Sequence, residues 1–103
     1  MKQTQLSQFD LNLLKVFAAV YRERHFTRAG RSLLISQSAV SHSLARLRTL
    51  FGDPLFVRTP DGMQPTALAE RLAEPIRRAL QSVGDALQVD RRFDPAEAEF
   101  EFT

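Results

Sequence analysis

Cysteine is absent from this sequence, and glycine occurs only four times in 103 residues. Without cysteine there can be neither a disulfide framework nor a zinc site built on thiolates. No glycine-rich phosphate-binding loop is visible either. Because nothing in the sequence points to an oxidising compartment, we expect a cytoplasmic protein.

Long hydrophobic runs are also missing. The most apolar stretch, Leu11 to Tyr21, is interrupted by Lys15 and is too short to cross a bilayer. No secretory cleavage pattern follows the first residues, so we expect no membrane segment. A content of 44% hydrophobic and 25% charged residues is typical of a folded protein, and 103 residues suffice for one small domain.

Residues for catalysis and metal binding are scarce as well. The two histidines, His25 and His42, have no cysteine or carboxylate at the spacing of metal ligands. Ser41 precedes His42, but sequence neighbours do not make a nucleophile and its base, since such groups meet through space. We therefore expect no enzyme activity, no metal and no cofactor.

Charge is unevenly distributed, although the formal net charge is only +2. Between residues 24 and 58 the single acidic residue, Asp53, is outnumbered by Arg24, Arg28, Arg31, Arg46, Arg48 and Arg58. From Asp85 onward, acidic residues outnumber basic ones. A central basic band favours nucleic acid as the partner, and the acidic end is expected to face away from phosphate.

Apolar spacing and capping residues predict three helices before residue 53. Asp10 precedes the first helix, residues 11 to about 24, and Thr27 is the expected cap of a second helix that reaches Leu34. A tight turn at Ile35 leads to a third helix at residues 36–51, capped by Ser36 and ended by Gly52. Its apolar face contains Ala39, Val40, Leu44, Leu47 and Phe51, and its polar face contains Gln37, Ser38, Ser41, His42 and Arg46.

A small hairpin and a long helix follow. Residues 55–57 predict a strand, Asp61-Gly62 a turn and residues 63–64 the return strand, which together form a wing at residues 55–64. Thr66 is expected to cap a last helix at residues 66–89, in which Pro75 predicts a kink or a boundary near residues 71–75. One apolar stripe runs along this helix through Leu68, Leu72, Ile76, Leu80, Val83 and Leu87.

Two short helices joined by a tight turn are typical of the helix-turn-helix, whose second helix enters the major groove of DNA. The polar face of residues 36–51 suits this task, because Gln37 can pair with adenine edges and Arg46 with guanine or phosphate. Small serine side chains let the helix approach the bases closely. The predicted fold is mainly α, a winged helix-turn-helix followed by a long final helix.

Four segments of the chain support this interpretation as a set. They are Phe26-Thr27-Arg28-Ala29, Ile35-Ser36-Gln37-Ser38-Ala39-Val40-Ser41, Arg46-Leu47 and Gly52-Asp53-Pro54-Leu55-Phe56-Val57-Arg58. In this order and spacing they resemble the DNA-binding domain of the LysR-type transcription regulators of bacteria. The match extends over roughly residues 10–89, and it implies sequence-specific binding of double-stranded DNA.

The resemblance also names the expected DNA contacts. The family positions are Thr27, Ser36, Gln37, Ser38, Ser41, His42 and, in the wing, Arg58. The basic band adds Arg28 and Arg46 to the expected contacts. Ser38 stands where the family usually has proline and His42 where arginine is common, so the usual base preferences do not carry over there. Gly30 replaces a more common alanine at a cost of roughly 0.5 to 1 kcal/mol of helix stability, which close packing against the third helix would offset.

A dimer is a further implication of the resemblance, because the linker helix of this family pairs antiparallel with its copy. The stripe from Leu68 to Leu87 is the physical counterpart, and two heads spaced by about 34 Å would require an interrupted palindrome in the DNA. We expect a DNA-binding head at residues 1–65, a dimerisation helix at residues 66–89, and a hinge with the start of an effector-binding domain at residues 90–103. A small-molecule sensing domain is implied after Thr103, and tetramer formation stays open.

Simpler interpretations exist beside this one. Winged helices also serve as protein-interaction modules without nucleic acid, although the basic band beside polar readers argues against that role. Sequence-indifferent binding would require more lysine and more exposed aromatic residues. The stripe from Leu68 to Leu87 could pack on the chain's own core, but a small head cannot cover all of it. Arg58 could serve only to keep an edge strand soluble.

Overall fold

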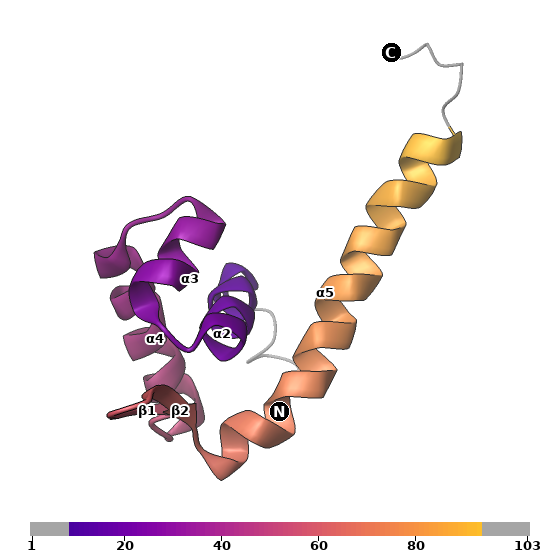
Figure 1. Cartoon of the computed structure of the whole chain (residues 1–103). Coiled ribbons are helices and arrows are strands. Elements are labelled where there is room, and N and C mark those ends of the chain that lie inside the picture. Colours follow the sequence, from indigo (N-terminus) through magenta and orange to yellow (C-terminus); the bar gives the residue numbers. More distant parts are fainter. Residues whose placement is uncertain (1–8, 94–103) are drawn as a thin grey trace.

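The computed structural model describes residues 9–93. Its elements follow in the order α2 (Asn12–Glu23), α3 (Phe26–Leu33), α4 (Gln37–Phe51), β1 (Phe56–Thr59), β2 (Gly62–Pro65) and α5 (Ala67–Phe93). In Figure 1, α2 lies between α4 and α5, the hairpin adjoins the first turns of α5, and the rest of α5 extends away. The predicted winged helix-turn-helix followed by a long helix is confirmed.

The core of the head lies between the inward faces of α2 and α4 and is closed by the hairpin. Its largest fully buried side chains are Phe17, Phe56, Leu13, Leu44, Leu47, Leu55, Val20 and Val40. The ring centroids of Phe17 in α2 and Phe56 in β1 lie 5.3 Å apart. This contact packs the wing directly against the first helix of the head.

Polar side chains begin the helices by accepting hydrogen bonds from free backbone N–H groups. Asp10, Ser36 and Thr66 each accept such a bond in the first turn, at 2.9, 3.0 and 3.2 Å, as predicted. The prediction that Thr27 caps the second helix is wrong. The cap is the Nδ1 atom of His25, because α3 already begins at Phe26 and Thr27 lies inside its first turn.

The crossing of α3 and α4 depends on Gly30. A Cβ atom at this position would lie 2.7 Å from the carbonyl oxygen of Ile35 and 3.3 Å from the side chain of Val40. Leu34 ends α3 with a left-handed φ of 62°, so that Ile35 lies in the turn. The expected close packing of Gly30 against the third helix is confirmed.

The hairpin begins one residue later than the sequence predicts. Leu55 is buried and has a left-handed φ of 63°, so β1 starts at Phe56 and continues to Thr59. The carboxylate of Asp53 accepts hydrogen bonds from the Leu55 N–H at 2.8 Å and from the Thr66 hydroxyl at 2.7 Å. One side chain therefore holds both ends of the wing together.

Helix α5 runs through Pro75 without interruption, so the predicted boundary near residues 71–75 does not occur. Proline removes the hydrogen bond to the Arg71 carbonyl, and both residues are exposed, so water can bond to that carbonyl instead. The helix ends at Phe93 rather than at residue 89, so residues 90–93 of the expected hinge are helical. The rest of the expected hinge, residues 94–103, lies outside the described residues. Within residues 9–93, no helix is both long and apolar enough to span a membrane.

The head covers the first part of the apolar stripe on α5. Leu68, Leu72 and Leu80 pack against the core, and Ile76 is only 7% exposed. The stripe then continues past the head, where Val83 and Leu87 are 60% and 63% exposed. The prediction that a small head cannot cover the whole stripe is confirmed, although the head covers more than half of it. The head therefore leaves two stripe positions uncovered, Val83 and Leu87.

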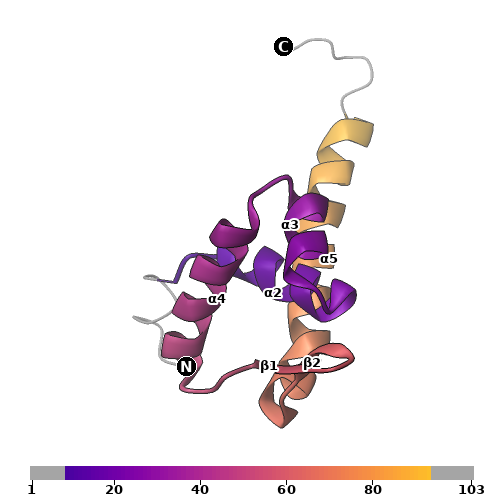
Figure 2. The same ribbon diagram turned by 60° about the vertical axis from the view of Figure 1, so that its left-hand side comes forward.

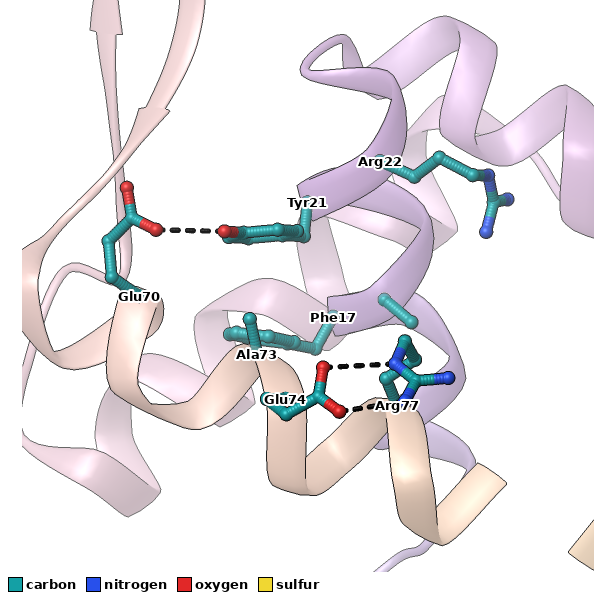
Figure 3. A pocket seen from close by; sticks show the side chains of 8 residues that line it. Phe17, Tyr21, Arg22, Glu70, Ala73, Glu74 and Arg77 are labelled. Carbon is teal, nitrogen blue, oxygen red and sulfur yellow. Dashed lines mark hydrogen bonds and ion pairs between the residues drawn. The ribbon is translucent and has the colours of Figure 1, made fainter. Parts of the chain in front are cut away.

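Figure 3 shows the groove between α2 and α5. The hydroxyl of Tyr21 in α2 donates a hydrogen bond to Glu70 in α5 at 2.8 Å. This bond raises the pKa of Tyr21, because loss of the phenol proton would remove the bond and place a second negative charge beside Glu70. Glu74 and Arg77 form an ion pair at 2.7 Å further along the groove. The Tyr21–Glu70 bond adds to the apolar packing that holds α5 against the head, whereas the Glu74–Arg77 pair joins two residues of α5 itself.

Candidate nucleic-acid interface

Helix α4 presents its polar face on the outside of the head. Ser36, Gln37, Ser38, Ser41 and His42 are all exposed. The opposite face of the same helix is buried in the core through Val40, Leu44 and Leu47. Figures 1 and 2 both place α4 on the side of α2 that faces away from α5. The polar residues predicted to read DNA therefore share one accessible surface.

A hydrogen bond joins the two helices of the helix-turn-helix at this surface. The hydroxyl of Thr27, in the first turn of α3, donates to Oε1 of Gln37, the first residue of α4, at 3.0 Å. The sequence predicts a separate DNA contact at each of the two positions. The structure shows that they touch each other.

The wing comes close to the same two residues. A shallow hollow of about 140 Å³ is lined by Arg24, His25, Phe26, Thr27, Gln37, Arg58, Gly62 and Met63. The hairpin is held there by a hydrogen bond from the Met63 N–H to the Arg24 carbonyl at 3.1 Å. The start of α4 and the arginine of the wing thus border one hollow.

Known proteins resemble this chain in sequence and in geometry. Residues 11–70 match the family model described as bacterial regulatory helix-turn-helix protein, lysR family. The chain belongs to the LysR family. The resemblance found in the four sequence segments is thereby confirmed.

Two LysR-family relatives show the extent of the match. The chain is 46% identical over 99 residues to the transcriptional activator NahR of Pseudomonas putida, and 48% identical over 99 residues to the transcriptional regulator LeuO of Escherichia coli. Each alignment covers 96% of this chain but only 33% and 31% of the two relatives. The chain thus spans about a third of the length of these curated relatives.

Solved structures of similar chains have the same fold. A probable transcriptional regulator from Pseudomonas aeruginosa matches with a TM-score of 0.79 and 47% identity, covering 82% of this chain and 28% of that one. The DNA-binding domain of BenM, solved with catB site 1 DNA, matches with a TM-score of 0.75 and 25% identity, covering 82% of this chain and 96% of that one. The winged helix-turn-helix of this LysR-family chain therefore has solved counterparts over its described head and linker helix.

Two arginines of the basic band in this LysR-family head have structural partners. Arg24 is half-buried, donates to the Tyr21 carbonyl at 2.6 Å, and holds its guanidinium over the Tyr21 ring at 4.8 Å. Arg48 donates to the carbonyls of Pro54 and Phe56 at 2.8 and 2.9 Å. Both side chains support the start of the wing and the loop before α3, so less of the band is available for phosphate than its sequence indicates.

The other arginines of the expected site lie on the surface. Arg28 lies 3.8 Å from Glu23, and Arg46 lies 3.5 Å from Asp10, in ion pairs whose arginines are at least half-exposed. Such pairs contribute little stability in water, so phosphate can replace the carboxylate at low cost. Arg28 also donates a hydrogen bond to the Glu23 carbonyl at 3.0 Å. Arg58 is exposed in β1 and has no ion pair within the described part of the chain.

Proposed function

We propose that this chain is the DNA-binding head of a bacterial transcription regulator and binds double-stranded DNA sequence-specifically. The proposal depends chiefly on one observation, the exposed polar face at the start of α4 beside the arginine of the wing. Membership of the LysR family supports it. So do the domains of BenM and CbnR, which are similar in fold and were solved in complexes with DNA.

In the proposed complex, α4 enters the major groove and presents Gln37, with its neighbouring serines and His42, to the base edges. Arg28, Arg46 and Arg58 supply phosphate contacts, which make the affinity depend on salt. The wing lies on the backbone or in the minor groove. The proposed DNA-contacting set is Arg28, Ser36, Gln37, Ser38, Ser41, His42, Arg46 and Arg58, and Thr27 belongs to the same surface through its hydrogen bond to Gln37.

A homodimer is part of the proposal. The exposed end of the stripe, at Val83 and Leu87, is apolar surface that an antiparallel copy of α5 would cover. Two heads would then bind an interrupted palindrome. We further propose that the regulator acts in the cytoplasm, has no enzymatic activity and no cofactor of its own, and responds to a small molecule only through an effector domain beyond residue 103.

Gln37→Ala tests the reading role of α4. This change removes the amide that contacts a base edge, and we expect discrimination between the bound sequence and a scrambled one to fall about 5-fold to 150-fold. The preferred duplex is first selected from random DNA with the unaltered chain, and dissociation constants are then measured on both duplexes. Gln88→Ala, an exposed glutamine change on α5, should leave the discrimination as it was. Unaltered discrimination in Gln37→Ala would contradict the assignment of α4 as reader.

Arg58→Ala tests the phosphate role of the wing. Removing one phosphate contact should weaken binding to selected and scrambled duplexes by a similar factor, and it should reduce the slope of log affinity against log salt by about 0.9. Salt titrations of both duplexes measure this slope. Arg78→Ala, which removes an equal charge from the exposed surface of α5, is the matched control. A loss confined to the selected duplex would instead assign Arg58 to base reading.

A further inference from the structure

We infer that Thr27 is a positioning residue, which holds the side chain of Gln37 in the orientation that reads a base. The inference rests on the proposed function, because it assigns Thr27 a task within the same DNA-binding surface. It replaces a direct DNA contact by Thr27 with an indirect one. Its basis is the 3.0 Å hydrogen bond between the Thr27 hydroxyl and Oε1 of Gln37.

The two ends of this bond differ in freedom. Thr27 is half-buried within the first turn of α3, whereas Gln37 is exposed at the first position of α4. The turn between the helices is itself fixed, since Ile35 donates from its N–H to the Gly30 carbonyl at 2.9 Å and Gly30 leaves no room for a Cβ atom. The hydroxyl of Thr27, which has a fixed position, thus restrains the side chain of Gln37, which would otherwise sample many rotamers.

The direction of the bond determines what Gln37 offers to DNA. Because the Thr27 hydroxyl donates to Oε1, the carbonyl end of the amide is engaged and the NH₂ end carries two donors that Thr27 does not use. Acceptors in the major groove are N7 and O6 of guanine, N7 of adenine and O4 of thymine, whereas cytosine presents a donor. The pair therefore presents donors to an acceptor such as N7 of adenine, and the second lone pair of Oε1 can still accept from the adenine N6 amino group. A side chain already ordered in the free protein also loses less conformational entropy on binding.

A double-mutant cycle separates positioning from direct contact. Affinities of the unaltered chain, Thr27→Val, Gln37→Ala and the double variant are measured on the duplex that the unaltered chain selects from random DNA. Gln37→Ala first identifies the position in the duplex at which the base preference is lost. The affinities are then measured again on duplexes that carry each of the three other base pairs at that position. Thr27→Val keeps the shape of the side chain but removes the donor, and we expect it to lower discrimination at that position about threefold to tenfold.

Two further results are expected from the cycle. Thr27→Ser restores the hydroxyl and should recover most of the lost discrimination. In the Gln37→Ala background, Thr27→Val should have no further effect, because the side chain that it positions is gone. Thermal unfolding of each variant shows that the fold is retained.

The contrary outcomes are distinct. If Thr27→Val lowers discrimination equally with and without Gln37, or has no effect at all, the positioning role is overturned while DNA reading by α4 stands. If Gln37→Ala itself changes nothing, both the reader and its positioning residue are rejected. If the unaltered chain enriches no sequence from random DNA, the proposed function fails as well.

Discussion

Three residues other than glycine have a left-handed backbone within residues 9–93: Arg24, Leu34 and Leu55, with φ values of 57°, 62° and 63°. This conformation costs roughly 1 to 2 kcal/mol for a residue with a Cβ atom. Leu55 is fully buried in the core, and the carbonyl of Arg24 accepts a hydrogen bond from the wing. Leu34 is 91% exposed, so its side chain gains little packing in return.

Leu34→Asn is therefore expected to stabilise the head. Asparagine tolerates the left-handed region better than leucine, and we expect the free energy of unfolding to rise by about 0.5 to 1 kcal/mol. Urea unfolding followed by circular dichroism measures the change. Leu50→Asn is the control, because Leu50 is also exposed but lies inside α4, where asparagine gives no such relief. Equal changes at both positions would mean that loss of an exposed leucine, rather than backbone conformation, causes the effect.

At the scale of elements, local signals predicted the order of helices and strands. Ser36 and Thr66 cap helices, Asp10 accepts a hydrogen bond from the first N–H of α2, and Gly52 ends a helix, because each acts on backbone groups only a few residues away. The sequence-based predictions are wrong where two neighbouring residues could each cap a helix and tertiary packing decides which one does. Thr27 is a good capping residue, but the start of α3 at Phe26 makes His25 the cap.

The candidate site was predictable in its faces but not in its internal contacts. The alternation of apolar and polar residues along α4 shows which side chains point outward. The Thr27–Gln37 bond depends on how closely α3 and α4 cross, which no local pattern encodes. The same holds for Arg24 and Arg48, whose roles in holding the wing depend on its three-dimensional position.

Replacement of glycine by alanine should have opposite effects on stability at Gly30 and at Gly84. Gly30→Ala places a Cβ atom 2.7 Å from a backbone carbonyl of the turn, and we expect a loss of about 1 to 3 kcal/mol in unfolding free energy. Gly84→Ala meets nothing within 4 Å, and we expect α5 to gain about 0.5 to 1 kcal/mol in helix stability. Thermal unfolding of the head and the helical signal in circular dichroism measure the two effects. A gain at Gly30 would show that the α3–α4 crossing is looser than the structure indicates.

The whole molecule is elongated, with extents of 52 × 33 × 22 Å, because the far end of α5 extends beyond the head. The sequence shows one uniform stripe, in which Leu80 and Leu87 look alike. Only the position of α2 beside α5 decides that Leu80 packs on the head and Leu87 does not. Dimerisation through this stripe is therefore expected to depend most on the part beyond the head.

Leu87→Glu tests this dependence, because it places a charge on the proposed dimer surface without touching the core of the head. We expect the mass in solution, measured by sedimentation, to fall toward that of a monomer while the thermal unfolding of the head stays the same. Since linked heads bind a two-part site far more tightly than separate ones, affinity for a full palindrome should drop by about 100-fold or more, with little change on a half-site. Gln88→Glu adds the same charge one residue later on another face of α5 and should preserve the dimer. If both variants dissociate alike, charge near the end of the helix is the cause, and the apolar stripe beyond the head is not the dimer contact.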